Sequence, residues 1–514
     1  MPKEGISKDG YIPGYIIHEY LKNFARDYEL LPRIQLEPTV TSVQRTASGH
    51  WLVHLTDDQK LECEKLIWAI GTASHPIMPE WESSTFANPV IHSAHTGTEL
   101  KQIASANREK KTVDWVIRED GAGTIAMVPP TLFGIWNMVD VVSTRAVASM
   151  SASIMNTSGF LYNLIHRTRP GRLAAQGFWR WLTYISDREA DYQSDENFEK
   201  LETYSARLWV SMPCHIIKSL VKLIFPCFRA FWVRAGLGTA SAPDFWKTLH
   251  SGDLIVYRSE VESLSHTDVV NLKNGISLQS DMVISCTGFS KPHGPFGADL
   301  REELGLSYAQ ADAAKWAELD AVADNKVDRL LPILGDIGAP EPKQSSLTLV
   351  LPDRRSRANR TTIARSQRSI RRLAAKDDRS ICFLGQIHSI FTPTTNELAA
   401  LWASAYMLGK LQLPSEAVME TQVAESNAWE RKRYLEMGAK NSYCILDFLS
   451  DSSSLTLWHP DPSKQYIDTL AKDLGIRPAR KSDPFSEMFV RYKPRDYKGL
   501  VNEFLAAQAK LRRP

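Results

Sequence analysis

Three glycines that follow short apolar runs are the residues with the clearest chemical meaning in this chain. Gly71, Gly288 and Gly385 each end a run of aliphatic and aromatic residues typical of a strand. A strand that ends at a residue without a side chain lets its backbone approach a bound dinucleotide closely. One such strand is weak evidence, because any parallel α/β sheet produces it. Three of them in one chain favour a dinucleotide-binding protein.

The segments before the first two glycines share one plan. Residues 15–28 carry apolar side chains at helical spacing, and residues 34–55 alternate between apolar and polar, so we expect a helix and then a β-hairpin. Residues 66–70 are continuously apolar, which predicts a strand buried on both faces. Residues 254–286 repeat a β-meander, with an Asn-Gly turn, that leads into a second buried strand.

The rest of the chain is predicted to be mainly helical. Residues 381–385 form a third apolar strand, followed by a helix from about 396 to 411 and a helical, polar tail from about 466. Residues 136–246 are rich in helix-forming and aromatic residues. We interpret this insert as a wall of the substrate site, although its Trp and Phe residues are equally consistent with an ordinary core. The fold class is therefore predicted to be α/β.

The order of these motifs resembles that of flavin-containing monooxygenases and their Baeyer–Villiger-type relatives, of the kind found in fungal secondary metabolism. Residues 66–76 are similar to the family's first Ala-Thr-Gly strand, with Ile70 in place of the usual Thr. Residues 86–93 resemble its Phe-x-Gly-x-x-x-His fingerprint, with Asn88 in place of Gly. The second Ala-Thr-Gly-Tyr strand and the closing strand have counterparts at residues 286–289 and 381–386.

The resemblance implies a two-dinucleotide-binding-domain flavoprotein with a helical insert. It implies FAD and NADPH as cofactors, and insertion of one oxygen atom from O2 into a small organic substrate. The cofactor carries that chemistry, so no catalytic acid–base pair is expected. Arg118 falls where relatives place a residue near the 2′-phosphate of NADPH. The other predicted cofactor-binding residues are Val40, Gly71, Gly288, Gly385 and Gln386.

Both nucleotide-binding loops of the family are missing from the pattern. Its members begin with a Gly-x-Gly-x-x-Gly turn whose backbone amides hold the FAD pyrophosphate, and no such turn precedes Tyr15. The second turn, expected between His92 and Val113, is also absent. Residues 121–126 spell GxGxxA, but two prolines follow within one turn and no helix is expected to begin there. Both Rossmann units are therefore expected to be incomplete, and the chain poorly soluble.

The missing loops leave a second interpretation, a flavin-free homologue that acts as a cofactor-independent cyclase-like enzyme or a non-catalytic partner. Omission of exons from the translated sequence is a third.

We divide the chain into an FAD-domain remnant, an NADPH-domain remnant with its insert, an Arg-rich connection, and a return to the FAD domain with a helical tail. These segments are residues 1–100, 101–295, 296–378 and 379–514.

Composition excludes several classes of protein. The 514 residues are 43% hydrophobic and 23% charged, with a net charge of +2, so a large core is expected and a nucleic-acid partner is not. Six scattered cysteines indicate neither a disulfide framework nor a metal site. The first ten residues lack the apolar stretch of a secretory signal, which predicts a cytoplasmic protein.

Two further features each have a functional and a structural interpretation. Residues 208–237 are the most hydrophobic part of the chain, but four basic residues interrupt them, so peripheral membrane contact or a core helix is expected rather than a membrane span. His92 is the best single polar candidate for chemistry, yet a histidine in this position more commonly hydrogen-bonds to backbone at the end of a strand. His388 is expected either to face the flavin or to occupy a surface turn.

Overall fold

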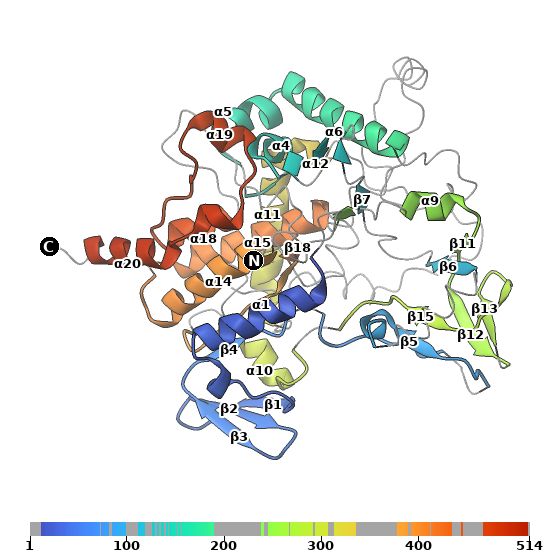
Figure 1. Ribbon diagram of the computed structural model, residues 1–514. Coiled ribbons are helices and arrows are strands. Elements are labelled where there is room, and N and C mark those ends of the chain that lie inside the picture. The colour runs from blue at the N-terminus through green and yellow to red at the C-terminus, as the bar shows by residue number, and fades with distance from the viewer. Residues whose placement is uncertain are drawn as a thin grey trace. The chain divides into compact units, whose positions relative to one another are not determined.

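The computed structural model describes most of the chain (Figure 1). The described residues are 12–71, 73–81, 85–98, 112–118, 126–128, 131–132, 135–137, 140–141, 143–151, 153–155, 157–189, 238–240, 245–266, 268–290, 293–306, 313–335, 378–388, 392–411, 413–433, 444–445 and 466–511. The hydrophobic stretch 208–237 and the arginine-rich residues 354–372 lie outside them. Among the described residues, no helix is long and apolar enough to cross a membrane.

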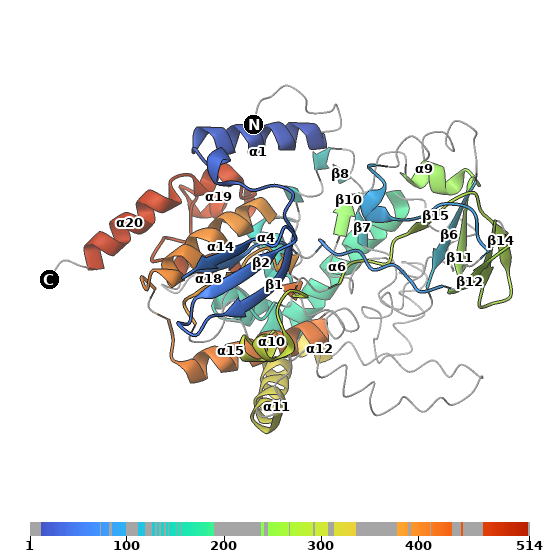
Figure 2. The ribbon, with the colours of Figure 1, turned by 90° about the horizontal axis from the view of Figure 1, so that it is seen from below.

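The chain forms two compact units, Met1–Glu64 with Gly294–Gly297, and Lys65–His293 with Ala298–Pro514. The first unit contains helix α1 (Gly14–Asp27), the 3-10 turn η1 (Leu31–Arg33) and an antiparallel sheet, visible in blue in Figure 2. The strands of that sheet are β1 (Val40–Arg45), β2 (Trp51–Leu55) and β3 (Lys60–Cys63). The predicted helix and hairpin are confirmed.

The small core of the first unit is built on alternate residues of the hairpin. Trp51, Val53 and Leu55 are buried along one face of β2, and Val43 is buried on β1. Phe296 is also buried and forms a parallel bridge with Val43. The two-residue period of the sequence therefore produced the expected one-sided sheet.

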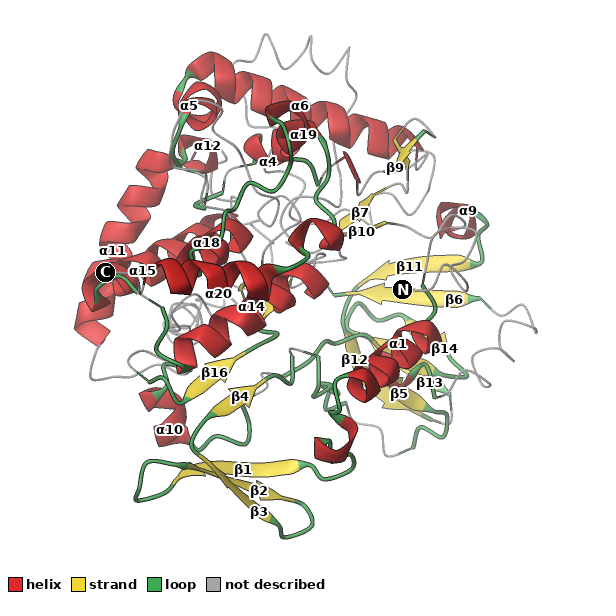
Figure 3. Ribbon diagram, turned by 60° about the vertical axis from the view of Figure 1, so that its left-hand side comes forward, coloured by secondary structure: helices red, strands yellow, loops and turns green. Residues whose placement is uncertain are grey.

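Parallel strand pairs organise the second unit and join segments far apart in the sequence. β4 (Leu66–Trp68) pairs with β16 (Ile381–Phe383), and β5 (Val90–His92) pairs with β15 (Val283–Ser285). Figure 3 shows β4 beside β16, and likewise β6 beside β11. The remaining parallel pairs are β6 (Val113–Ile117) with β11 (Leu254–Arg258), β7 (Ala126–Val128) with β10 (Gly238–Ala240), and β17 (Ile387–His388) with β18 (Cys444–Ile445).

Antiparallel strands and short helices complete this part of the chain. The predicted meander is confirmed as β12 (Val261–Ser265), β13 (Val269–Leu272) and β14 (Ser277–Gln279), with Gly275 of the Asn-Gly turn at a φ of 84°. The remaining elements are β8 (Thr131–Leu132), β9 (Trp136–Asn137), η2 (Ser93–His95), α4 (Arg145–Ser149), α5 (Phe160–Tyr162), the π-helical turn η3 (Asn163–Arg167), α6 (Arg169–Glu189), α9 (Phe245–His250), α10 (Ala298–Glu303) and α12 (Pro332–Gly335).

The largest hydrophobic core lies among the C-terminal helices. It forms around α14 (Thr392–Met407), which buries Trp402, and α15 (Glu416–Arg433), which buries Trp429. Helix α11 (Ala313–Leu330) packs along α15. The chain ends with α18 (Tyr466–Asp473), α19 (Pro484–Phe489), η7 (Pro494–Tyr497) and α20 (Leu500–Leu511).

Two predictions about burial are wrong. Strands β4 and β15 are not buried on both faces, because Ile67 is 45% exposed and Ile284 is 42% exposed, whereas β16 is buried throughout. A continuous apolar run shows that a strand can be covered on both faces, but only the helices packed against it decide whether it is. The tail from Tyr466 is helical as predicted but not polar, since Tyr466, Ile467 and Leu470 lie in the core.

The mixture of helices and parallel strand pairs confirms the α/β fold class. The GxGxxA sequence was excluded correctly, because the element that begins at Ala126 is a strand and not a helix. The division into four segments is a finer statement than the two compact units, and it stays a prediction.

Candidate cofactor site

Gly71 and Gly385 meet where two parallel strands end. The register of β4 and β16 aligns Trp68 with Phe383, and the backbone N–H of Leu384 donates to the Trp68 carbonyl at 2.9 Å. The chain then turns at both glycines with positive φ, 71° at Gly71 and 72° at Gly385. A Cβ on Gly385 would lie 3.1 Å from the Gly71 Cα. The two turns therefore form one bare edge, in which neither residue has a side chain.

Gly288 is tied to the same segment by backbone hydrogen bonds. Its carbonyl accepts from the Ile77 N–H at 2.9 Å, and Ser290 N–H donates to the His75 carbonyl at 2.8 Å. The connection from Gly71 to Ile77 can span at most ~20 Å. Gly288 also has a positive φ, 81°. Gly288 is therefore hydrogen-bonded to the segment that follows Gly71, and Gly71 itself lies against Gly385.

His92 has the structural role that the sequence favoured. Its side chain is 1% exposed, and its Nδ1 accepts from the Ala94 N–H at 3.1 Å. Nε2 is therefore the protonated nitrogen, and it donates to the Gly288 carbonyl at 3.0 Å. The ring packs edge-on against Phe289. His92 fixes the second glycine turn, and both ring nitrogens are used in doing so.

The polar residue beside the bare edge is Gln386. It follows Gly385 directly, is 5% exposed, and neither its Oε1 nor its Nε2 has a hydrogen-bond partner among the described residues. Thr395, in the first turns of α14, is 1% exposed and its hydroxyl likewise has no partner in the described part of the chain. Buried polar atoms are nearly always paired in a folded protein, so unpaired ones indicate a missing ligand or water.

Thr395 was not predicted from the sequence. The signal that could have found it is its place at the start of the helix after the third glycine-ended strand, where backbone N–H groups are also unpaired within the helix. Gln386 was predicted as a cofactor contact. Its burial without a partner fits that assignment, which stays a prediction.

Two other predicted contacts lie on other elements of the fold. Val40 opens β1 in the first unit, opposite Leu55. Arg118 is exposed immediately after β6. The side chain of His388 lies outside the described residues. For Val40 and Arg118 a role in cofactor binding therefore stays a prediction.

Cysteine chemistry is not favoured at this edge. Cys382 is fully buried in β16, and burial, followed by the charge of Asp378, raises the pKa of its thiol to about 12. A thiol with that pKa is protonated at neutral pH and is a poor nucleophile.

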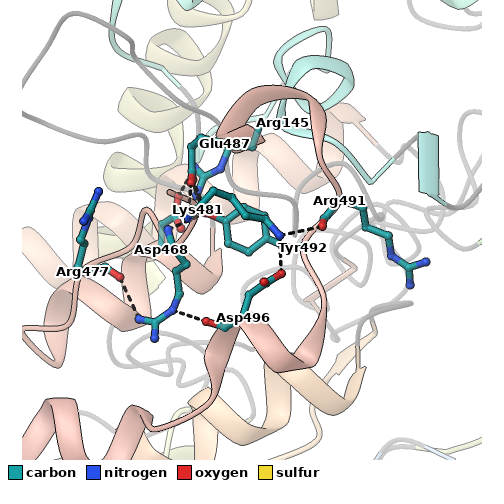
Figure 4. A network of polar contacts seen from close by, with 9 residues as sticks. Arg145, Asp468, Arg477, Lys481, Glu487, Arg491, Tyr492 and Asp496 are labelled. Carbon is teal, nitrogen blue, oxygen red and sulfur yellow. Dashed lines mark hydrogen bonds and ion pairs between the residues drawn. The ribbon is translucent and has the colours of Figure 1, made fainter. Parts of the chain in front are cut away.

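A second buried polar cluster lies between α4 and the C-terminal segment (Figure 4). Arg145 and Asp468 are each 1% exposed and pair at 3.4 Å, and Arg145 also pairs with Glu487 at 2.6 Å. Tyr492 accepts from Arg145 at 2.8 Å and donates to Glu487. Burial raises the pKa of the Tyr492 hydroxyl, so that it stays neutral in this cluster. We call these four residues the Arg145 cluster.

The Arg145 cluster continues into a second layer of ion pairs. The Lys481 backbone N–H donates to Glu487 at 2.9 Å, and the Lys481 ammonium pairs with Asp496 at 2.6 Å. Arg480 pairs with Glu503 through both ends of its guanidinium, at 2.5 and 3.0 Å. Each of these charged groups joins two separate parts of the chain. The contacts therefore form a structural network.

Comparison with known proteins places the chain among curated relatives over nearly its whole length. The FAD-dependent monooxygenase DEP4 of Fusarium langsethiae is 41% identical over 532 residues, which cover 98% of this chain and 83% of the relative. DEP4 of Alternaria brassicicola is 41% identical over 529 residues, with the same coverage. The FAD-dependent monooxygenase resA of Aspergillus sclerotiorum is 28% identical and covers 99% of this chain and 87% of the relative.

Among solved structures, cyclohexanone monooxygenase from Rhodococcus sp. Phi1 bound to NADP+ matches with a TM-score of 0.48 and 13% identity, covering 91% of this chain and 83% of the other. S-allyl-L-cysteine S-oxygenase from Allium sativum matches with a TM-score of 0.38 and 12% identity, covering 99% and 79%. No family model matches the sequence. On the identity and coverage of its curated relatives, the chain belongs to the family of FAD-dependent monooxygenases.

Proposed function

We propose that this protein is an FAD-dependent, NADPH-using monooxygenase that inserts one oxygen atom from O2 into a small organic molecule, of the secondary-metabolite type. The observation that carries the proposal is the bare edge formed by Gly71 and Gly385, beside the unpaired carboxamide of Gln386. A glycine backbone admits a planar cofactor closely, and an unpaired buried amide supplies hydrogen bonds to it. The relatives that are 41% identical over 98% of the chain are named FAD-dependent monooxygenases.

FAD, when bound, supplies the redox chemistry with O2, and the protein supplies position and exclusion of water. The backbone at Gly71, Gly288 and Gly385 would hold the cofactor at its closest approach. His92 would keep the Gly288 turn in place through its hydrogen bond to the carbonyl. Gln386 and Thr395 would hydrogen-bond to the cofactor, because they are buried beside this edge and on the following helix.

Two further roles belong to this proposal. Arg118 is exposed at the end of β6, and its charge suits the 2′-phosphate of NADPH. The aromatic insert, residues 136–246, would line the substrate site.

The visible spectrum of the purified chain tests the proposal. We expect an oxidised-flavin spectrum with about one FAD per chain after reconstitution, and NADPH oxidation coupled to oxygen uptake. A Gly385→Val variant is expected to lose bound FAD, because a branched side chain would enter the space occupied by the Gly71 backbone. Gly177→Ala, in α6, is the control, since nothing lies within 4 Å of its added Cβ. A colourless, folded preparation that takes up no FAD would overturn the proposal and favour a flavin-free, cyclase-like enzyme or a non-catalytic partner.

A further inference from the structure

We propose that Gln386 recognises FAD through both atoms of its carboxamide, by pairing with an edge of the cofactor that presents a hydrogen-bond donor beside an acceptor. This inference rests on the proposed function and adds to it the part of the cofactor that the residue binds. FAD has two such edges, the pyrimidine edge of the flavin ring and the adenine edge.

The side chain of Gln386 is almost completely buried. Gln386 is 95% buried, with both Oε1 and Nε2 shielded from solvent and without partners in the described residues. Leaving a buried donor and a buried acceptor unpaired destabilises the folded state. A side chain kept for packing alone would be better replaced by an apolar one of the same length, so the carboxamide is explained by a ligand.

The shape of the carboxamide selects the kind of ligand atom. It presents one acceptor and one donor side by side, so its complement must present a donor and an acceptor at the same spacing. The pyrophosphate of FAD offers acceptors only and does not meet that requirement. The two ring edges do, and bidentate pairing of glutamine with adenine is a known example of such geometry.

The neighbouring residues are consistent with a ligand at this position. Gly385, immediately before Gln386, contacts the Gly71 turn and leaves the backbone bare. Thr395, on the helix that follows, is a second buried polar side chain whose hydroxyl is unpaired among the described residues. Gln386 and Thr395 flank the short strand β17 in the sequence, and each presents a buried polar group without a partner among the described residues.

The test compares stability without FAD and affinity for FAD in one variant. Gln386→Met keeps the length of the side chain and removes both polar atoms. We expect the thermal midpoint of the FAD-free protein to rise, because two unpaired buried atoms are removed. We expect the dissociation constant for FAD, measured by quenching of flavin fluorescence, to increase about tenfold to thirtyfold for the two lost hydrogen bonds. Thr395→Val is expected to change both quantities in the same directions, by a smaller factor in affinity.

Asn271→Ala is the matched control. Its amide is satisfied by the hydroxyls of Ser263, Ser265 and Ser277, all within the meander. Loss of a satisfied amide is expected to lower the thermal midpoint and leave FAD affinity unchanged. Opposite signs of the stability change at Gln386 and Asn271 are the signature of a residue kept for a ligand.

The midpoint potential of the bound flavin distinguishes the two edges. A shift in potential in Gln386→Met assigns the flavin ring, and an unchanged potential with weaker binding of ADP assigns the adenine. Either result supports the proposal. The proposal would be overturned if Gln386→Met bound FAD as tightly as the wild type, or if the thermal midpoint of the FAD-free variant were lower than that of the wild type. In either case, FAD binding by the wild-type chain would leave the proposed function intact. Failure of the wild-type chain to bind FAD would overturn the proposed function itself.

Discussion

The Arg145 cluster and the glycine edge are both buried and both polar, but they differ in how their polar atoms are satisfied. Arg145 reaches two carboxylates and a tyrosine hydroxyl, contributed by α18, by α19 and by the chain just after α19. Gln386 and Thr395 have no partner among the described residues. In the Arg145 cluster each charged side chain has a partner of opposite charge within the chain, which stabilises the fold, whereas a buried carboxamide with neither atom paired among the described residues indicates a position for a ligand. The Arg145 cluster is therefore structural, and the glycine edge is the candidate binding region.

The largest expected effect is from breaking the Arg145 cluster. Arg145→Met leaves Asp468 and Glu487 buried without their cation, and such a loss costs about 3–5 kcal/mol of unfolding free energy. Urea unfolding followed by tryptophan fluorescence measures it. The triple variant Arg145→Met, Asp468→Asn, Glu487→Gln is expected to recover part of the loss, because it leaves no unpaired charge. A loss below about 1 kcal/mol in the single variant would contradict the structural role.

A smaller effect is expected at the glycine edge, where the two glycines differ. Gly71→Ala meets nothing within 4 Å, so its cost is the positive φ alone, about 1–2 kcal/mol. Gly385→Ala carries the same φ cost and also meets the Gly71 backbone at 3.1 Å, so it should cost more and weaken FAD binding further. Urea unfolding and FAD titration of both variants measure this. Equal losses at the two positions would show that the contact between the turns does not matter.

The pH dependence of stability tests the outer layer of the Arg145 cluster. Hydrogen bonds from the Arg480 guanidinium hold the pKa of Glu503 below its ordinary value of 4.5. A depressed carboxylate pKa adds stability above pH 4.5, and that stability is lost as the pH falls through the lower, folded-state pKa. Glu503→Gln should therefore flatten the decline of stability below pH 4.5. Denaturant midpoints across the acid range measure the slope, and an unchanged slope would remove Glu503 from the network.

The smallest effect is expected between α11 and α15, where ion pairs are partly exposed. Lys432 pairs with Asp328 at 2.8 Å, and Lys326 pairs with Glu425 at 2.5 Å. Each such pair contributes about 0.2–1 kcal/mol and is screened by salt. Lys432→Gln should lower stability slightly at low ionic strength and not at high. A loss that persists in high salt would show that this pair resembles the buried Arg145 cluster more than a surface pair.

The local elements were largely predictable because each depends on residues close in sequence. The alternation of residues 34–55 gave the hairpin, the spacing of residues 15–28 gave α1, and the three glycine turns fell where the apolar runs ended. Burial was less predictable. The sequences around Ile67 and Ile284 are typical of central strands, yet both side chains are exposed. Burial depends on what packs against a strand, which the strand's own sequence does not specify.

The sequence by itself determined the family motifs and the strand ends at Gly71, Gly288 and Gly385, and it favoured a backbone role for His92 that the structure confirmed. Only the tertiary structure decided that Gly385 and Gly71 touch, and that Gln386 and Thr395 are buried without partners among the described residues. It also decided that Arg145 pairs with Asp468, from a tail expected to be polar. The physical reason is distance along the chain: a φ preference is a property of one residue, whereas pairing and burial depend on residues that are hundreds of positions apart.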